Sequence, residues 1–301
     1  MLHSRERQAV WIYYAALLFV VAFWGISSVI YTFFYKYYSA AVLTSIMTFF
    51  SAIFFWVFAG KQLKKINKQF LRVVVPICTL NALANVLQRI GLQYTTPANY
   101  AFSEHLSCIV VPIMMFVFVR KKPRLTQVIA GISCLAGCFI LCGVSFRGGS
   151  VLGIGDGLCL LSGVLIGVSV AAIAAYTKGV NPILFMVVYM TTYFLVSVLL
   201  AIGLDMTTIE SAKLTGGWSM LLLVAVFGLV DVALCWLLRT EAIRHIDPVT
   251  VATVSPCSAV ITGLVSVCVG IDRLSPNLLV GGGIIFLSVV LPEALATRKN
   301  T

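Results

Sequence analysis

Ten apolar segments, separated by short connections, occupy most of this 301-residue chain. Each has about 18–25 residues, the length that an α-helix needs to cross the hydrocarbon core of a bilayer. Continuous runs of this length favour spanning helices, whereas a β-barrel would show shorter segments of alternating polarity. We predict an all-α integral membrane protein with ten transmembrane helices. The segments are residues 11–35, 38–59, 73–93, 97–119, 126–144, 151–176, 182–203, 218–242, 248–269 and 277–294.

The composition agrees with a membrane protein and argues against a soluble one. Apolar residues make up 60% of the chain and charged residues 10%, whereas a soluble domain has about 25% charged residues. The net charge is +11, but the charges cluster between the apolar segments, where they orient helices and face anionic lipid headgroups. We therefore expect the lipid bilayer, and no nucleic acid, as a partner.

The distribution of Lys and Arg predicts the orientation. With the N-terminus inside, sixteen of the 21 fall in cytoplasmic segments, Arg239 and Arg244 among them, while four lie outside and Arg89 lies within a span. The positive-inside rule then places both termini in the cytoplasm. The first apolar run is too long for a signal-peptide core, so it is expected to remain as the first span. Short loops without organelle signals suggest a multi-pass protein of the cytoplasmic (inner) membrane.

The ten segments divide into two halves of five, which would insert with opposite orientations. Residues 91–97, which end the third segment, resemble residues 242–248, which end the eighth. The segment after each hairpin has an internal proline, Pro112 or Pro256. These matches predict two inverted five-helix repeats, residues 1–147 and 148–301, an arrangement that secondary transporters use with the substrate site near the midplane.

Three stretches resemble the EamA family of the drug/metabolite transporter superfamily: residues 23–27 (Phe-Trp-Gly-Ile-Ser), 91–123 and 241–285. The resemblance implies a ten-helix monomeric carrier with a central cavity that moves amino acids, nucleoside-type metabolites, quaternary amines or drugs, commonly outward. The chain departs from many members in having Met47-Thr48 where they carry Arg, and residues 270–273 where they carry Gly-Glu. The identity of the solute therefore stays open.

A polar stripe marks the third segment. Asn81, Asn85 and Gln88 fall at positions i, i+4 and i+7 of one helix face, and Arg89 extends the stripe toward the outside. Bare amides in lipid are costly, so this face must meet protein or water. Two interpretations follow: the stripe lines a substrate cavity, or it only hydrogen-bonds to neighbouring helices.

Asp231 lies near the middle of the eighth segment, which is the repeat counterpart of the third. Burial disfavours the ionised form of a carboxyl group. The residue is therefore a candidate site for proton coupling or for a substrate ammonium group. A purely structural aspartate is the alternative.

Arg89 and Glu104 lie at equal distances from the hairpin between the third and fourth segments. An intramembrane charge must be paired or face water, and it often marks a pathway. The two residues are predicted to form an ion pair, which is either structural or an outward-side gate that opens when substrate competes for one partner.

Aromatic and hydroxyl side chains complete the candidate substrate site. Trp24 and Trp236 are candidates for cation–π contacts, although core packing explains many membrane tryptophans. Ser255 and Ser258 flank Pro256, which lacks a backbone donor and so exposes carbonyl groups. Cys134, Cys138 and Cys142 share one helix face and are expected to pack rather than bind metal.

These observations predict a secondary transporter, an exporter or exchanger working by alternating access. An acid and an arginine together favour amino-acid-like zwitterions, with the acid as a candidate for proton coupling, whereas the acids with aromatic rings favour an organic cation or drug. An intramembrane lipid-modifying enzyme is the rival class, but the sequence shows no nucleophile–base arrangement. No catalytic residue, metal ligand or cofactor is predicted.

Overall fold

The computed structural model describes residues 2–92, 94, 103, 105–120, 122–141, 153–205, 217–270 and 276–298. The described residues form helices and their connections and contain no strand. Glu104 and Cys142 lie outside them. The helices are α1 (Leu2–Phe34), α2 (Ala40–Ala59), α3 (Lys68–Gly91), α5 (Ser107–Val119), α6 (Leu125–Leu141), α7 (Ile154–Tyr176), α8 (Pro182–Leu200), α9 (Trp218–Gly228), α10 (Cys235–His245), α11 (Pro248–Val254), α12 (Cys257–Cys268) and α13 (Pro276–Arg298).

Within the described residues, seven helical stretches are long and apolar enough to cross a membrane. The shorter apolar helices within the described residues are Ser107–Val119, Leu125–Ile140 and Pro276–Val289. Large apolar side chains such as Phe58, Leu199 and Phe286 are exposed on the outside of the bundle, as lipid contact requires. The protein is therefore a multi-pass membrane protein. The seven stretches are Trp11–Phe34, Ala40–Lys65, Lys68–Leu92, Ile154–Tyr176, Pro182–Gly203, Trp218–His245 and Pro248–Cys268.

Side-chain caps determine where several helices begin. Asn67 accepts a hydrogen bond from the backbone N–H of Phe70 at 2.8 Å, so α3 starts at Lys68, five residues before the predicted span. Asn181 and Asp247 cap α8 and α11 in the same way, and each is followed by a proline at the first helical position. Proline fits there because the first turn has no intrahelical partner for its N–H.

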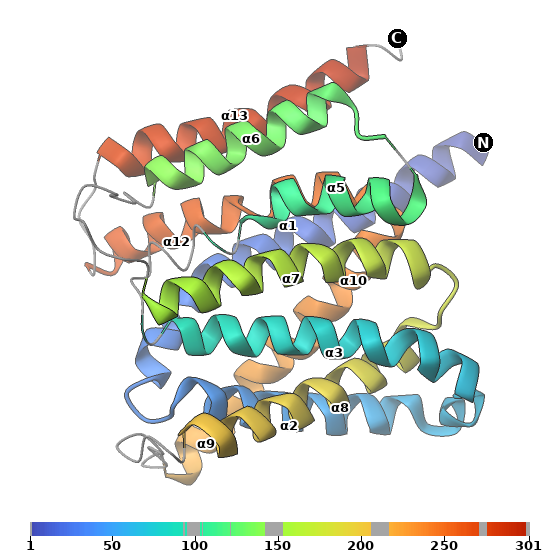
Figure 1. Ribbon diagram of the computed structural model, residues 1–301, viewed down its shortest axis with the longest axis vertical. Coiled ribbons are helices and arrows are strands. Elements are labelled where there is room, and N and C mark those ends of the chain that lie inside the picture. Colours follow the sequence, from blue (N-terminus) through green and yellow to red (C-terminus); the bar gives the residue numbers. More distant parts are fainter. Residues whose placement is uncertain are drawn as a thin grey trace.

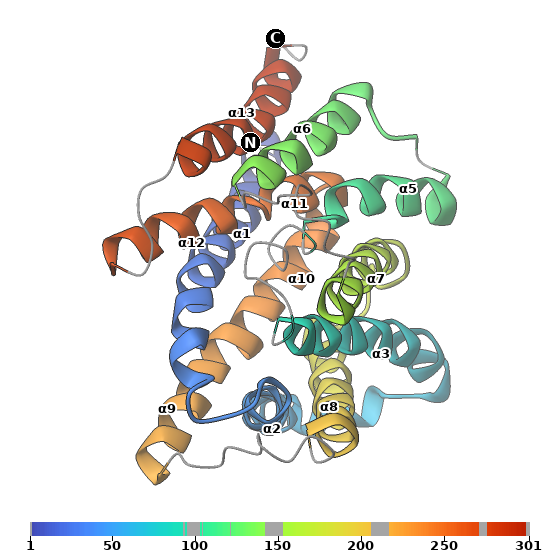
Figure 2. The same cartoon turned by 60° about the vertical axis from the view of Figure 1, so that its left-hand side comes forward.

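The helix contacts in the first half of the chain recur in the second half with the halves exchanged. The pair α3–α7 corresponds to α10–α1, and α5–α7 corresponds to α12–α1, while α2–α8 and α6–α13 correspond to themselves. Figures 1 and 2 show the α6–α13 pair on one side of the bundle, and α2, α8 and α9 on the opposite side. Helices α1, α3, α7 and α10 lie between them.

The ninth predicted span is two helices rather than one, α11 and α12, separated at Ser255 and Pro256. Pro256 has no N–H, so it cannot satisfy the carbonyl of Ala252 one turn earlier. That carbonyl accepts a hydrogen bond from the thiol of Cys108 on α5 at 3.0 Å. The thiol of Cys134 on α6 lies 3.7 Å from the carbonyl of Thr253. The carbonyls exposed by the proline are thus used for helix packing.

The predicted packing role of the cysteines is confirmed for Cys134 and Cys138, which are fully buried in a cluster with Cys108 and Ile285.

A glycine allows a close approach between α1 and α12. A Cβ built on Gly25 of α1 would lie 2.7 Å from the Cβ of Ile261 and 2.9 Å from the carbonyl of Ser258, both on the α12 side. Gly25 therefore allows α1 and α12 to touch immediately beside Trp24.

Candidate functional site

Asp231 lies in a short π-helical segment, Leu229–Leu234, which joins α9 to α10 within one continuous helix. It is 2% exposed. π-Helical turns inside α-helices are rare and occur frequently at functional sites. The indole N–H of Trp24 on α1 donates to the backbone carbonyl of Asp231 at 3.2 Å. The buried backbone at Asp231 is thus held against α1.

A chain of polar contacts joins Asp231 to Arg89 on α3. The hydroxyl of Tyr31 on α1 donates to Oδ2 of Asp231 and accepts from Nη2 of Arg89 at 2.7 Å. The same Nη2 lies 3.9 Å from Oδ2, and the guanidinium carbon lies 4.4 Å above the centre of the Tyr31 ring. A tyrosine therefore lies between a buried acid and a partly buried base that come from different halves of the chain.

This contact gives Arg89 partners that the sequence did not predict. The sequence predicted an ion pair with Glu104, which lies outside the described residues. The structure shows Arg89 with Tyr31 and Asp231. The predicted pair with Glu104 stays a prediction, while Tyr31 and Asp231 are partners that the hairpin spacing did not indicate.

A second arginine lies against two tryptophans. The rings of Trp24 and Trp236 are 5.4 Å apart between centroids and tilted by 55°. The guanidinium carbon of Arg239 is 5.1 Å from the Trp24 ring and 5.2 Å from the Trp236 ring. Tyr189 on α8 meets Trp236 edge to face at 5.2 Å. The two candidate tryptophans are thus brought together, as their mid-span positions suggested.

Arg239 was wrongly assigned to the cytoplasmic segments. It lies inside the Trp218–His245 helix and is only 6% exposed. The predicted span ended close to it, and a basic residue near a span end is normally a surface charge. The repeat itself indicates a buried position for Arg239. When Pro97 is aligned with Pro248, Arg239 takes the position of Gln88 in the polar stripe. The Lys and Arg bias toward the cytoplasm keeps its sign after this correction.

The amides of the polar stripe have different surroundings. Asn81 is 1% exposed, and its Oδ1 accepts from the hydroxyl of Tyr189 at 2.9 Å and from Nδ2 of Asn85 at 2.6 Å. Nδ2 of Asn81 and Nε2 of Gln88 are buried without a hydrogen-bond partner among the described residues. Buried donors left unpaired cost free energy, so these groups call for an acceptor from water or a solute.

Ser255 and Ser258 are not drawn into this cluster by the contacts observed. The hydroxyl of Ser255 donates to the carbonyl of Val251 at 2.8 Å, one turn earlier. The carbonyl of Ser258 accepts from the hydroxyl of Thr262 at 3.0 Å and faces Gly25. Both residues are half-buried at the α11–α12 break. The contact between α1 and α12 separates them from Trp24.

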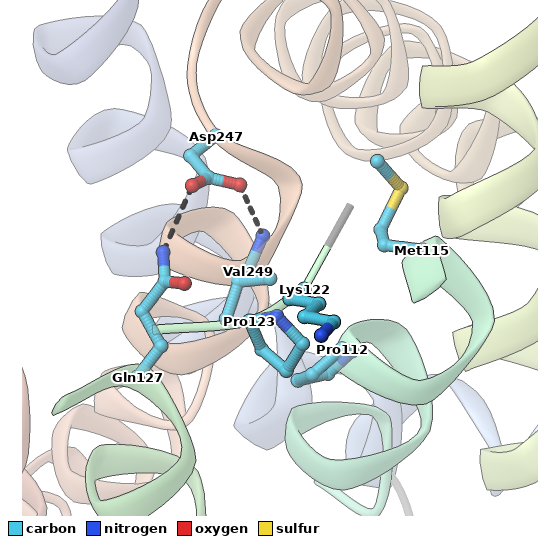
Figure 3. Close-up of a pocket in the computed structure, with 7 residues that line it drawn as sticks. All are labelled: Pro112, Met115, Lys122, Pro123, Gln127, Asp247 and Val249. Carbon is cyan, nitrogen blue, oxygen red and sulfur yellow. Dashed lines mark hydrogen bonds between the residues drawn. The ribbon is translucent and has the colours of Figure 1, made fainter. Parts of the chain in front are cut away.

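A pocket lies at the helix ends rather than at Asp231 (Figure 3). Its wall includes Asp247, which accepts from Nε2 of Gln127 at 2.8 Å and from the backbone N–H of Val249 at 3.4 Å. The Gln127–Asp247 bond joins α6 of the first half to the start of α11 in the second. The other residues of the wall are Pro112, Met115, Lys122 and Pro123.

The central cluster therefore offers an acid, two guanidinium groups, aromatic faces and amides, contributed by α1, α3, α8 and the Trp218–His245 helix. This set is suited to reversible binding of a small polar solute. Within the described residues, no group of three or more His, Cys, Asp or Glu side chains is arranged to hold a metal ion.

Among curated proteins, none matches the chain. A protein solved by crystallography aligns with a TM-score of 0.75 at 18% sequence identity, over 98% of this chain and 99% of the other, and this agreement supports the fold. The sequence model of the EamA-like transporter family matches residues 11–143 and again residues 153–292. The resemblance noted in the sequence is thus confirmed in both halves, and the chain belongs to the EamA-like transporter family, whose members carry small molecules across membranes.

Proposed function

We propose that this protein is a secondary transporter that exports or exchanges amino-acid-like zwitterions, coupled to protons through Asp231. The observation that carries the proposal is the partly buried Tyr31–Arg89–Asp231 chain, in which acid and base come from different halves of a repeat protein. In alternating access one repeat moves against the other around a fixed site. A site assembled from both halves is well placed to sense that motion.

The charges of the cluster suit a zwitterion. A solute ammonium group would compete with Arg89 for Asp231, and protonation of Asp231 would weaken the hydrogen bond that it accepts from Tyr31. Either event would loosen the link between α1, α3 and the Trp218–His245 helix. The partly unpaired amides of Asn81 and Gln88 supply donors for the same solute.

The membrane arrangement belongs to the same proposal. We place ten spans in two inverted repeats, residues 1–147 and 148–301, with both termini in the cytoplasm, the cytoplasmic (inner) membrane as the location and a monomer as the working unit. The exchange of helix contacts between the halves supports the inverted repeats. The start of α1 and the end of α13 lie toward the same end of the bundle in Figure 1, which supports termini on one side.

An organic cation is the second candidate solute. The observation that favours it is the Trp24–Trp236 pair, whose faces already hold a guanidinium group. Aromatic faces bind quaternary ammonium ions by the same electrostatic attraction.

The proposal is tested by flux into proteoliposomes that contain a pH-sensitive dye. Wild type and Asp231→Asn are supplied with pools of amino acids or of quaternary amines. We expect solute-dependent proton movement in wild type and its loss in folded Asp231→Asn. Asp247→Asn is the matched control, because Asn also caps helices and Asp247 lies at the start of α11. Solute flux without proton movement, equal in wild type and Asp231→Asn, would contradict the coupling role.

A further inference from the structure

We propose that Arg89 and Tyr193 together bind the carboxylate of the transported solute. The inference rests on the proposed function, because it assigns one end of an amino-acid-like zwitterion to two named side chains. Arg89 belongs to α3 and Tyr193 to α8, and these helices pack side by side (Figures 1 and 2). The apolar sequence around Tyr193 does not indicate such a role.

The hydroxyl group of Tyr193 is the first argument. The side chain is 0% exposed, and its ring packs on that of Tyr189 with centroids 5.7 Å apart. The hydroxyl lies close enough to Arg89 and Asp231 for electrostatic interaction, but it has no hydrogen-bond partner within the described residues. Phenylalanine would fill the same space, and an unpaired buried hydroxyl costs free energy. The hydroxyl therefore calls for a partner beside Arg89.

The guanidinium group of Arg89 is the second argument. Its Nη2 donates to Tyr31 at 2.7 Å and lies 3.9 Å from Oδ2 of Asp231. Its Nη1 is buried and has no hydrogen-bond partner in the described part of the chain. An unpaired donor on a charged group is especially costly. One nitrogen thus maintains the link to Asp231, while the other is suited to an acceptor from the solute.

The chemical kind of the unpaired groups is the third argument. On α3, the buried nitrogens without a partner in the described structure also include Nδ2 of Asn81 and Nε2 of Gln88. Amide and guanidinium nitrogens donate hydrogen bonds and do not accept them. An ammonium group has no acceptor to offer them, whereas a carboxylate has two oxygens that accept several hydrogen bonds. This set of donors therefore fits the anionic end of a solute.

The distance between Arg89 and Asp231 is the fourth argument. An α-amino acid carries its ammonium and carboxylate groups on one carbon atom, so it requires an acid and a base that are close together. When the solute ammonium takes Asp231, as in the proposed function, the guanidinium group loses its acidic partner. A buried charge without a partner is strongly unfavourable. The solute carboxylate replaces that partner, and every charge stays paired.

The test compares amino acids with their carboxamides, which keep the ammonium group and lose the carboxylate charge. Counterflow of each proteinogenic L-amino acid is measured in proteoliposomes, and inhibition by the acid and by its amide is titrated for each one that wild type transports. In Tyr193→Phe we expect the half-inhibiting concentration of the acid to rise about tenfold, because a hydrogen bond to a charged group is lost. The value for the uncharged amide should rise only about twofold.

Melting temperature in detergent separates binding from structure. Tyr193→Phe removes a buried hydroxyl that has no partner, so the melting temperature without solute should be unchanged or higher. The increase on adding a transported amino acid should be smaller than in wild type, since a ligand stabilises a protein according to its affinity. A lower melting temperature without solute, with an unchanged ratio of acid to amide, would make the hydroxyl structural and overturn the proposal.

Two further variants sharpen the test. Tyr35→Phe is the matched control, because Tyr35 also interacts electrostatically with Arg89 but is only half-buried, and its hydroxyl is not one of the buried groups that lack a partner. Its ratio of acid to amide should equal that of wild type. Arg89→Lys keeps the positive charge but not the planar group with several nitrogens, so it should weaken binding of the acid more than that of the amide.

The outcomes separate the two proposals. An unchanged ratio of acid to amide in folded Tyr193→Phe and Arg89→Lys overturns the carboxylate role and leaves the transporter standing. Equal changes of that ratio in Tyr193→Phe and Tyr35→Phe also overturn it, because they would not be specific to the Tyr193 hydroxyl. No flux of any amino acid in wild type rejects the amino-acid preference of the proposed function, and this inference with it.

Discussion

At the scale of single residues, the notable arrangement is a tyrosine between an acid and a base. Arg89 and Asp231 approach only to 3.9 Å, and the hydroxyl of Tyr31 bonds to both. Removing one partner of a buried ion pair is strongly destabilising, because the other charge stays buried. The hydroxyl of Tyr31 gives each of the two charged groups a hydrogen-bond partner. These hydrogen bonds are weaker than a close ion pair, so a solute ammonium group can compete for the carboxyl group of Asp231.

Tyr31→Phe tests this role. The ring stays beneath Arg89, but two hydrogen bonds to charged groups are lost, and we expect a loss of stability of about 1–3 kcal/mol. Solute flux should fall about tenfold, because a solute ammonium would then compete with a direct Arg89–Asp231 pair rather than a hydroxyl. Melting temperature in detergent and counterflow measure the two effects.

Tyr35→Phe is the matched control for this variant. Tyr35 stacks on Tyr31 with ring centroids 6.1 Å apart, and its hydroxyl forms no hydrogen bond within the described residues. It should retain both stability and flux. Equal losses in the two variants would show that the rings, and not the Tyr31 hydroxyl, are what matters.

Part of the candidate site follows from the sequence alone. Asp231 and Arg89 stand out because a charge inside an apolar segment needs a reason, and the two tryptophans stand out by their mid-span positions. The pairing of Arg89 with Asp231 depends on tertiary packing and has no local signal. The sequence did not identify Arg239 as a buried residue, because the boundary of a span is the least certain part of a hydropathy pattern.

At the scale of elements, close helix contact beside the site depends on Gly25. Its missing Cβ leaves room for Ile261 and for the carbonyl of Ser258 on the α12 side. The hydroxyl of Thr262 donates to the carbonyl of Gly25 at 2.9 Å across the same contact. The position of Trp24, the next residue toward the N-terminus, is therefore tied to the α11–α12 break.

Gly25→Ala should separate α1 from α12, because both atoms that the new methyl group would meet belong to rigid parts of the chain. We expect destabilisation of about 1–3 kcal/mol, the usual range for overpacking, and weaker solute binding as Trp24 shifts. Gly283→Ala on α13 is the control, since a Cβ there meets no atom within 4 Å; it should be neutral or stabilising by about 0.5–1 kcal/mol. Thermal denaturation in detergent compares them, and equal melting temperatures for Gly25→Ala and wild type would contradict the close contact.

The sequence located the helices better than their irregularities. Apolar length placed most described helices within about five residues of the expected ranges, because a bilayer demands a certain apolar length, but α1 begins at Leu2, well before its expected range of 11–35. The π-helical segment around Asp231 has no composition signal of its own. Pro256 predicted freed carbonyls correctly, but their acceptance of cysteine thiols depends on how α5 and α6 pack against α11.

At the scale of the whole molecule, the two halves make corresponding contacts. Helices α2 and α8 pair across the repeat, as do α6 and α13, and every other major pair described has its counterpart in the other half. The central cluster lies where the third span and its counterpart approach each other through α1 and α8. In the proposed alternating access, one half would move against the other around this cluster.

Cys268 provides a native probe of the proposed topology. It is the last residue of α12 and the exposed cysteine among the eight described. In Figure 1 that end of α12 lies opposite the start of α1 and the end of α13. With both termini in the cytoplasm, a membrane-impermeant maleimide should label Cys268 from outside intact cells. A Cys142→Ser background removes the ninth cysteine, and Cys268→Ser in that background should abolish labelling. Labelling only after permeabilisation would show that the topology is the inverse of the one proposed. The Tyr31–Arg89 contact lies near the ends of α1 and α3, at Phe34 and Gly91, which the proposed topology places toward the outside. The same result would place this contact toward the cytoplasm.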